Sequence, residues 1–329
     1  MKPFSCAIVG ATGMVGRMFI EVLEEYELPV SQLYPFASAR SVGKTVRFND
    51  QDIVIQELTP ESFDRGIDVA LFAVDDEISR TYAPIAVAKG CIVIDNSSAW
   101  RMEPDVPLVV PEVNRADILG HRGIIANPNC CAVPAAMVLK PLDDAHGVER
   151  VVISTYQSVS GAGVAGMRDL DATLAGEEPS FFPSPIAHNI IPHIGSFDED
   201  GYTGEETKIM AEVKKMLHRP DLKITATAVR VPVYTCHCLC INVALKKPFD
   251  MKELWRIFSY ADGVVLLGGD SVYPTPRLTV GSDNAYIGRL RRDTSVENGI
   301  NMWVVADNTR KGAAGNAVQI LEALAERNI

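Results

Sequence analysis

Residues 10–16 read Gly10-Ala11-Thr12-Gly13-Met14-Val15-Gly16. An apolar run, residues 4–9, precedes them, and apolar residues at helical spacing follow up to Glu25. A glycine-rich turn between a strand and a helix lets a phosphate approach the backbone N–H groups at the helix start. The spacing G-x-x-G-x-x-G is a variant of the dinucleotide-binding fingerprint. This stretch therefore predicts a nucleotide-binding βα unit.

The residues that follow continue the alternation of strands and helices. Strand patterns occur at residues 33–37, 69–74 and 91–95, with a helical pattern at residues 78–89. Such alternation predicts a Rossmann-like, doubly wound parallel sheet, whose ligands bind at the carboxyl ends of the strands. We therefore expect Ser97, just after the strand at 91–95, to lie beside the cofactor, with Arg101 reaching into the same cleft.

The end of the second strand indicates which nucleotide is bound. NAD-binding sheets usually place an acid there, which bonds the ribose 2′-hydroxyl. No acid occurs between Leu33 and Asn49, whereas Arg40 is flanked by Ser38 and Ser41. These three residues suit a 2′-phosphate, so we predict NADP.

The segment Asn127-Pro128-Asn129-Cys130-Cys131 lies between a strand pattern ending at Ala126 and an apolar helical run. Pro134 fits only the first turn of that helix, so Asn129 or Cys130 caps it. The positive end of a helix favours a thiolate, the nucleophilic form of cysteine. Cys130, at the turn, is therefore the predicted nucleophile.

Beyond Cys130 the pattern changes. Strands are expected at residues 151–159, 224–233, 238–245 and 302–306, with a helix at 251–260, which indicates a mixed, largely antiparallel sheet. Residues 177–204 are expected to form a long loop or an oligomer contact. The last helix, residues 312–327, is expected to return to the first domain. We predict an NADP-binding domain, 1–130 plus 309–329, and an α+β catalytic and dimerisation domain, 131–308.

A second set of polar residues lies at strands or strand ends of the second domain. His237 is the predicted acid–base partner of Cys130, and Arg230, among apolar residues, should pair with a carboxylate. Cys236, Cys238 and Cys240 would share one strand face with His237 on the other, and no C-x-x-C pair is present, so no metal site is predicted.

Composition excludes several classes of protein. The chain has 329 residues, 47% of them hydrophobic, and a formal net charge of −11. The acidic balance argues against nucleic-acid or anionic-membrane binding, and no apolar stretch reaches transmembrane length. Seven cysteines and no signal peptide suggest reduced thiols in a cytoplasmic protein.

Six motifs in order resemble bacterial aspartate-semialdehyde dehydrogenases over essentially the whole chain. They begin at Gly10, Asn127, Gln157, Glu205, Arg230 and Lys311 and read GATGxxG, NPNC, QxVSGAG, EExK, RVPV and KGAA. The resemblance implies reductive dephosphorylation of L-aspartyl-4-phosphate by NADPH through a cysteine thioester, on the route to lysine, threonine and methionine. It also implies a homodimer or homotetramer.

The resemblance also implies roles for individual residues. Cys130 is the nucleophile, His237 handles the proton, and helix amides with Asn129 hold the oxyanion. Gln157 orients the substrate, Arg230 binds its α-carboxylate and Glu205 its α-ammonium. The remaining roles are phosphate binding by Arg101 and Lys208, and cofactor binding by Gly10, Thr12, Gly13, Met14, Val15, Gly16, Ser38, Arg40, Ser41, Ser97, Ser160, Gly161 and Asn316.

Two alternatives remain open at this point. An N-acetyl-glutamyl-phosphate reductase would share the thioester chemistry and the fold, although the Gln157 segment and the Glu205 and Lys208 pair argue against it. A catalytically silent nucleotide-binding paralogue should have lost Cys130, His237 or Arg230, and the sequence retains all three.

Overall fold

The computed structural model describes residues 1–269 and 272–327, and residue contacts divide the chain into two compact units. Unit 1 comprises Met1–Pro128 with the described residues from Ala313 onward, and unit 2 comprises Asn129–Gly312. Residues 328–329, the end of the predicted segment 309–329, lie outside the described residues. None of the helices in the described part of the chain has the length and apolarity that a membrane crossing requires.

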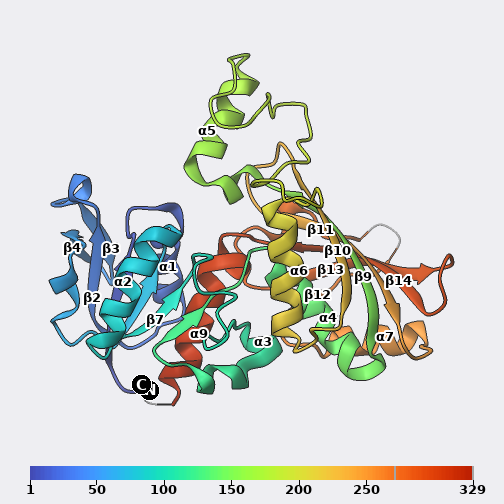
Figure 1. Ribbon diagram of the computed structural model, residues 1–329, viewed down its shortest axis with the longest axis horizontal. Helices are drawn as coiled ribbons and strands as arrows, with labels where there is room; N and C mark the ends of the chain where they lie inside the picture. Colours follow the sequence, from blue (N-terminus) through green and yellow to red (C-terminus); the bar gives the residue numbers. More distant parts are fainter. Residues whose placement is uncertain (270–271, 328–329) are drawn as a thin grey trace. The chain divides into compact units, whose positions relative to one another are not determined.

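Unit 1 contains a parallel six-stranded sheet with the order β5-β2-β1-β6-β7-β8. Figure 1 labels β2 and β7 of this sheet and the helices α1 and α2 of the same unit. This sheet confirms the predicted doubly wound fold. Its strands are β1 Phe4–Val9, β2 Val30–Ala37, β5 Gln56–Glu57, β6 Val69–Phe72, β7 Ile92–Asp95 and β8 Ile124–Ala126. The helices are α1 Met14–Glu25, α2 Asp76–Ala88, α3 Pro111–Asn114 and α9 Gly315–Ala325, and a separate hairpin pairs β3 Thr45–Phe48 with β4 Gln51–Val54.

Both faces of this sheet are buried. Alternate residues of β1 point to opposite faces, so Cys6 and Ile8 pack in one core with Leu23 of α1 and Leu321 of α9. Ala7 and Val9 belong to a second core, which α2 helps to form. The last helix of the chain therefore completes the core of unit 1.

Unit 2 contains a mixed six-stranded sheet with the order β10-β9-β11-β14-β13-β12, as predicted from the strand patterns. The β9–β11, β11–β14 and β14–β13 pairs are antiparallel, and the two outer pairs are parallel. The strands are β9 Val148–Gln157, β10 Lys223–Arg230, β11 His237–Leu245, β12 Val264–Leu266, β13 Ala285–Asp293 and β14 Gly299–Ala306. The helices are α4 Ala132–His146, α5 Gly163–Leu174, α6 Gly204–Met216, α7 Met251–Ser259 and α8 Pro276–Thr279.

Some sequence boundaries were wrong. β10 ends at Arg230 rather than at residue 233, because Pro232 has no N–H with which to continue the ladder of hydrogen bonds. Cys236 precedes β11 with a positive φ of 67°, so it does not belong to the strand face predicted for it. It still packs with Cys238 and Val305 in one small core.

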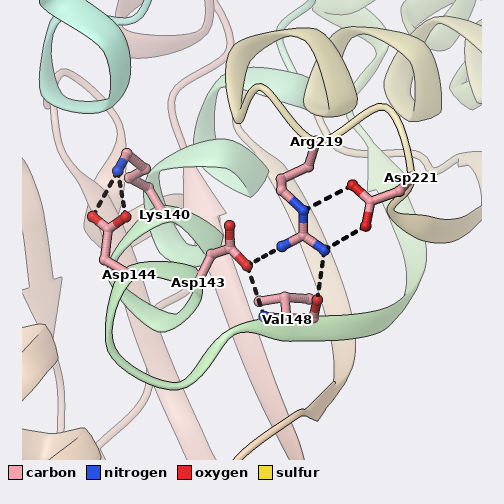
Figure 2. Close-up of polar contacts among 6 residues, drawn as sticks. All are labelled: Lys140, Asp143, Asp144, Val148, Arg219 and Asp221. Carbon is pink, nitrogen blue, oxygen red and sulfur yellow. Dashed lines mark hydrogen bonds and ion pairs between the residues drawn. The ribbon is translucent and has the colours of Figure 1, made fainter.

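An ion-pair cluster joins the last turn of α4, the segment that follows α6 and the start of β9 (Figure 2). The Arg219 guanidinium pairs with Asp143 on the last turn of α4 and with Asp221, and it donates to the Val148 carbonyl. The Val148 N–H donates to Asp143 at 2.7 Å. The cluster therefore ties together the C-terminal ends of α4 and α6, two helices that have candidate site residues at their N-terminal ends.

Candidate active site

The predicted nucleophile lies directly before α4. Cys130 is partly exposed, whereas the thiol of the next residue, Cys131, is fully buried. The two sulfurs and a ring nitrogen of His237 all lie within 4.8 Å of one another. The structure therefore brings the predicted nucleophile and its predicted acid–base partner together.

The two thiols have opposite tendencies to ionise. The hydrogen bond from Cys131 lowers the pKa of Cys130 well below its ordinary value, against the effect of burial, and the charges of His237 and Arg230 lower it further. Burial raises the pKa of Cys131, and its hydrogen bond to Cys130 raises that pKa again. Because only a thiolate attacks an acyl group readily, this asymmetry favours Cys130.

Asn129 caps the helix that follows Cys130. Its side-chain oxygen accepts the backbone N–H groups of Cys131 at 2.8 Å and Ala132 at 3.3 Å. These two amides are therefore already hydrogen-bonded, although the sequence suggested that they were free to bind an oxyanion. The Asn129 side-chain amide points instead to Glu205, whose carboxylate it meets at 3.0 Å.

Glu205 gathers the polar groups predicted to hold the substrate. Its Oε1 accepts from Asn129 and, at 2.9 Å, from Gln157, the last residue of β9. Sequence reasoning missed Glu212, which is 1% exposed and accepts the Asn129 backbone N–H at 2.6 Å. The spacing of seven residues from Glu205, two turns along the same helix face, was the available signal.

His237 is fully buried at the start of β11. Its Nδ1 lies 3.1 Å from both the backbone nitrogen and the hydroxyl of Ser158. Its Nε2 is buried and has no hydrogen-bond partner among the described residues. Gly161 lies against this ring, because a Cβ there would lie 3.0 Å from Nε2.

Arg230 is 4% exposed, and burial lowers the pKa of its guanidinium. Its Nη1 donates to the Ser158 carbonyl at 2.7 Å, while its Nε has no hydrogen-bond partner within the described chain. The backbone of Arg230 pairs with Ile191, which fixes the segment 177–204 at the end of β10.

Lys208, the predicted phosphate ligand, is exposed on α6.

The glycine-rich turn has the geometry of a nucleotide site. Gly10 has a φ of +90°, and a Cβ there would lie 2.3 Å from the Ala73 carbonyl oxygen. A Cβ on Gly16 would lie 2.2 Å from the carbonyl oxygen of Gly10. The first turn of α1 has no acidic residue and no side-chain cap. A cleft of about 500 Å³ runs past Gly10, Thr12, Gly13 and Ser38. Together these features fit a bound pyrophosphate.

The structure places the other predicted cofactor and phosphate ligands of unit 1 in different surroundings. Arg40 is exposed on a 3₁₀ turn, Ala39–Ser41, in which Ser41 is buried. Ser97 is buried and donates to Asp95, Arg101 donates to the carbonyls of Asn96 and Asn127, and Asn316 donates to Asn127. The predicted cofactor residues Ser160 and Gly161 belong to unit 2.

The thiol and imidazole groups also bear on metal binding. The Sγ atoms of Cys130 and Cys131 and a ring nitrogen of His237 lie close enough together to be three ligands of one metal ion. The sequence analysis weighed a metal site at Cys236, Cys238 and Cys240 instead. The absence of a metal site stays a prediction.

Comparisons with known proteins agree with this geometry. A model described as "Semialdehyde dehydrogenase, NAD binding domain" matches residues 5–121, and one described as "Semialdehyde dehydrogenase, dimerisation domain" matches residues 139–311. Aspartate-semialdehyde dehydrogenase of Aquifex aeolicus is 45% identical to this chain, and the match covers 99% of each.

Two crystal structures extend the comparison. Aspartate semialdehyde dehydrogenase II from Vibrio cholerae, complexed with ASA, is 42% identical with a TM-score of 0.95 over 100% of both chains. Aspartate semialdehyde dehydrogenase with NADP from Candida albicans is 27% identical with a TM-score of 0.79 over 99% of both chains. This chain therefore belongs to the aspartate-semialdehyde dehydrogenase family.

Proposed function

We propose that this protein catalyses the NADPH-dependent reductive dephosphorylation of L-aspartyl-4-phosphate to L-aspartate 4-semialdehyde and phosphate. The observation that carries the proposal is the cluster in which Cys130, partly exposed and with its lowered pKa, lies beside the buried His237. Family membership supports the substrate, since a similar protein binds ASA, and it supports the cofactor, since another binds NADP.

The first step is acyl transfer to Cys130. His237 takes the thiol proton, and the thiolate attacks the acyl carbon of the substrate, forming a C–S bond as the C–O bond to phosphate breaks. The side-chain amide of Asn129 supplies an oxyanion donor, a role worth about 3 kcal/mol in comparable sites. The product of this step is an acyl thioester on Cys130 and free phosphate.

The second step reduces that thioester. NADPH, when bound, would supply the hydride that this reduction needs. The C–S bond then breaks, the aldehyde leaves, and His237 returns the proton to sulfur. In this proposal the residues that hold the cofactor are Gly10, Thr12, Gly13, Met14, Val15, Gly16, Ser38, Arg40, Ser41, Ser97, Ser160, Gly161 and Asn316.

Charges in the site match the two ends of the substrate. We assign the α-carboxylate to Arg230, whose buried Nε has no hydrogen-bond partner among the described residues, and the α-ammonium to Glu205. Gln157 then holds the substrate between them through its existing contact with Glu205. Arg101 and Lys208 bind the departing phosphate.

The organisation of the chain belongs to the same proposal. Unit 1 is the NADP-binding domain, corresponding to 1–130 plus 309–329, and unit 2 is the catalytic and dimerisation domain, 131–308. The matched dimerisation model supports a homodimer or homotetramer formed through unit 2. The reduced Cys130 that the reaction needs favours a cytoplasmic location.

The direct test is NADP⁺ reduction with L-aspartate semialdehyde, with and without phosphate. The proposal predicts turnover that depends on phosphate, because phosphate must cleave the thioester. N-acetyl-glutamate semialdehyde serves as the competing substrate. Turnover of that compound alone, or no turnover of either aldehyde by folded protein, would refute the proposal.

A further inference from the structure

Asn308 follows β14 and links three segments of unit 2. It is 4% exposed. Its Oδ1 accepts from the hydroxyls of Ser158 at 3.1 Å and Ser160 at 3.2 Å, and from the backbone N–H of Cys236 at 2.9 Å. Its Nδ2 lies 3.0 Å from the Ser160 hydroxyl. One buried amide therefore holds the turn after β9 and the turn before β11.

Both of those turns determine where the ring of His237 lies. Ser158 supplies two partners of Nδ1, its backbone N–H and its hydroxyl. Cys236 immediately precedes His237 and adopts a φ of 67° that is unfavourable for a non-glycine residue. The side-chain Oδ1 of Asn308 compensates for that conformation by accepting the Cys236 backbone N–H.

We infer that Asn308 is a positioning residue, which fixes the ring of His237 and selects the tautomer that can accept the Cys130 proton. The part of this inference that concerns turnover rests on the proposed function. The effect of Asn308 on the ionisation of Cys130 can be measured without any substrate.

The proton positions explain this selection. The backbone N–H of Ser158 can donate only to an unprotonated Nδ1, and in that tautomer the proton occupies Nε2. The base-competent tautomer carries the proton on Nδ1, which needs an acceptor. The Ser158 hydroxyl oxygen is that acceptor, because its own hydrogen is donated to Asn308.

Proton transfer then balances within the cluster. The Cys130 S–H bond breaks and an N–H bond forms at His237 Nε2, which leaves a thiolate and an imidazolium. Nδ1–H stays hydrogen-bonded to the Ser158 hydroxyl throughout, and the Ser158 backbone N–H does not donate to Nδ1 in this tautomer. The other groups close to the ring are the Cys131 thiol, from the start of α4, and the Arg230 guanidinium, from the end of β10.

The test compares Asn308→Ala with Asn301→Ala, a control on β14 whose side chain instead accepts from Asn242. The substrate-free readout is the rate of Cys130 alkylation by iodoacetamide against pH, measured by peptide mass mapping. We expect Asn308→Ala to shift the midpoint to higher pH and to slow alkylation at neutral pH about tenfold. We also expect kcat to fall about tenfold with KM within about threefold.

Ser158→Ala keeps the test decisive if Asn308→Ala does not fold. It removes the hydroxyl that accepts Nδ1–H, together with the contacts of that hydroxyl to Asn308 and Ser160, and it keeps the Asn308 side chain, so it should shift the alkylation midpoint in the same direction. Wild-type alkylation profiles in folded Asn308→Ala, or in Ser158→Ala if the first variant does not fold, would overturn the inference. A shifted profile in a protein that turns over neither aldehyde would refute the proposed function and leave the positioning role intact.

Discussion

The narrow space around Gly161 yields a sharp prediction for Gly161→Ala. Gly161 lies in the 3₁₀ turn Val159–Ala162 that follows β9. An added Cβ would lie 2.7 Å from Nη1 of Arg230 and 3.0 Å from both Nε2 and Cε1 of His237. A single methyl group therefore displaces the predicted carboxylate ligand and the predicted acid–base residue together.

The size of the effect follows from these distances. Contact at ~3.5 Å requires Arg230 to move by about 0.8 Å and His237 by about 0.5 Å. Misplacement on the order of 1 Å at a catalytic group costs about 100-fold in rate. We therefore expect kcat/KM to fall about 100-fold, or about 2.7 kcal/mol of transition-state stabilisation. Displacement of Arg230 should raise KM as well as lower kcat.

The assay is phosphate-dependent NADP⁺ reduction with L-aspartate semialdehyde, alongside thermal unfolding. Gly120→Ala is the matched control, because no atom of the described residues lies within 4 Å of a Cβ at Gly120 and its φ is not positive. Gly120→Ala should keep wild-type kinetics. A Gly161→Ala enzyme whose kcat/KM stays within about threefold of wild type would refute the placement of Arg230 and His237 at the reacting centre.

Three further predictions follow from other parts of the structure. Cys131→Ala removes the hydrogen bond that lowers the pKa of Cys130, so the alkylation midpoint of Cys130 should move to higher pH; an unchanged midpoint would contradict the pairing. Arg219→Met breaks the link to Asp143 and should lower stability by about 2 kcal/mol and the Tm by about 2 to 4 °C, measured by calorimetry, with kcat unchanged. Burial raises the pKa of Cys91 to about 12, so its stabilising contribution is complete below the unfolded-state pKa of about 8.5 and is lost as pH rises towards 12. Urea unfolding should therefore show a shallower alkaline loss of stability in Cys91→Ala, and an equal loss would contradict the burial argument.

The sequence was sufficient for the elements that carry strong local patterns. β1 begins at Phe4 and α1 ends at Glu25, because an apolar strand, a glycine turn and helical periodicity agree there. Two neighbouring strands at one end of the unit 2 sheet, β13 and β12, were not predicted. β12 has only three residues, and β13 is interrupted by Gly288 and ends in charged residues, so neither shows a clear alternation.

The candidate site was predictable where chemistry depends on residue type. Cys130 was predicted as a nucleophile, and His237 was predicted because a nucleophile needs a proton acceptor. Glu205 was predicted from the family resemblance. Ser158 and Asn308 were missed because their importance depends on contacts between residues 150 positions apart. The sequence periodicity of a single strand cannot predict a contact between two such distant residues.

The most direct test of the account is a search for the acyl-enzyme itself. The protein is mixed with L-aspartyl-4-phosphate in the absence of NADPH, quenched with acid, and mapped by tandem mass spectrometry. The account predicts an aspartyl thioester on Cys130 that is absent from Cys130→Ser. An adduct on Cys131, or turnover by Cys130→Ser, would contradict the claim that Cys130 is the nucleophile.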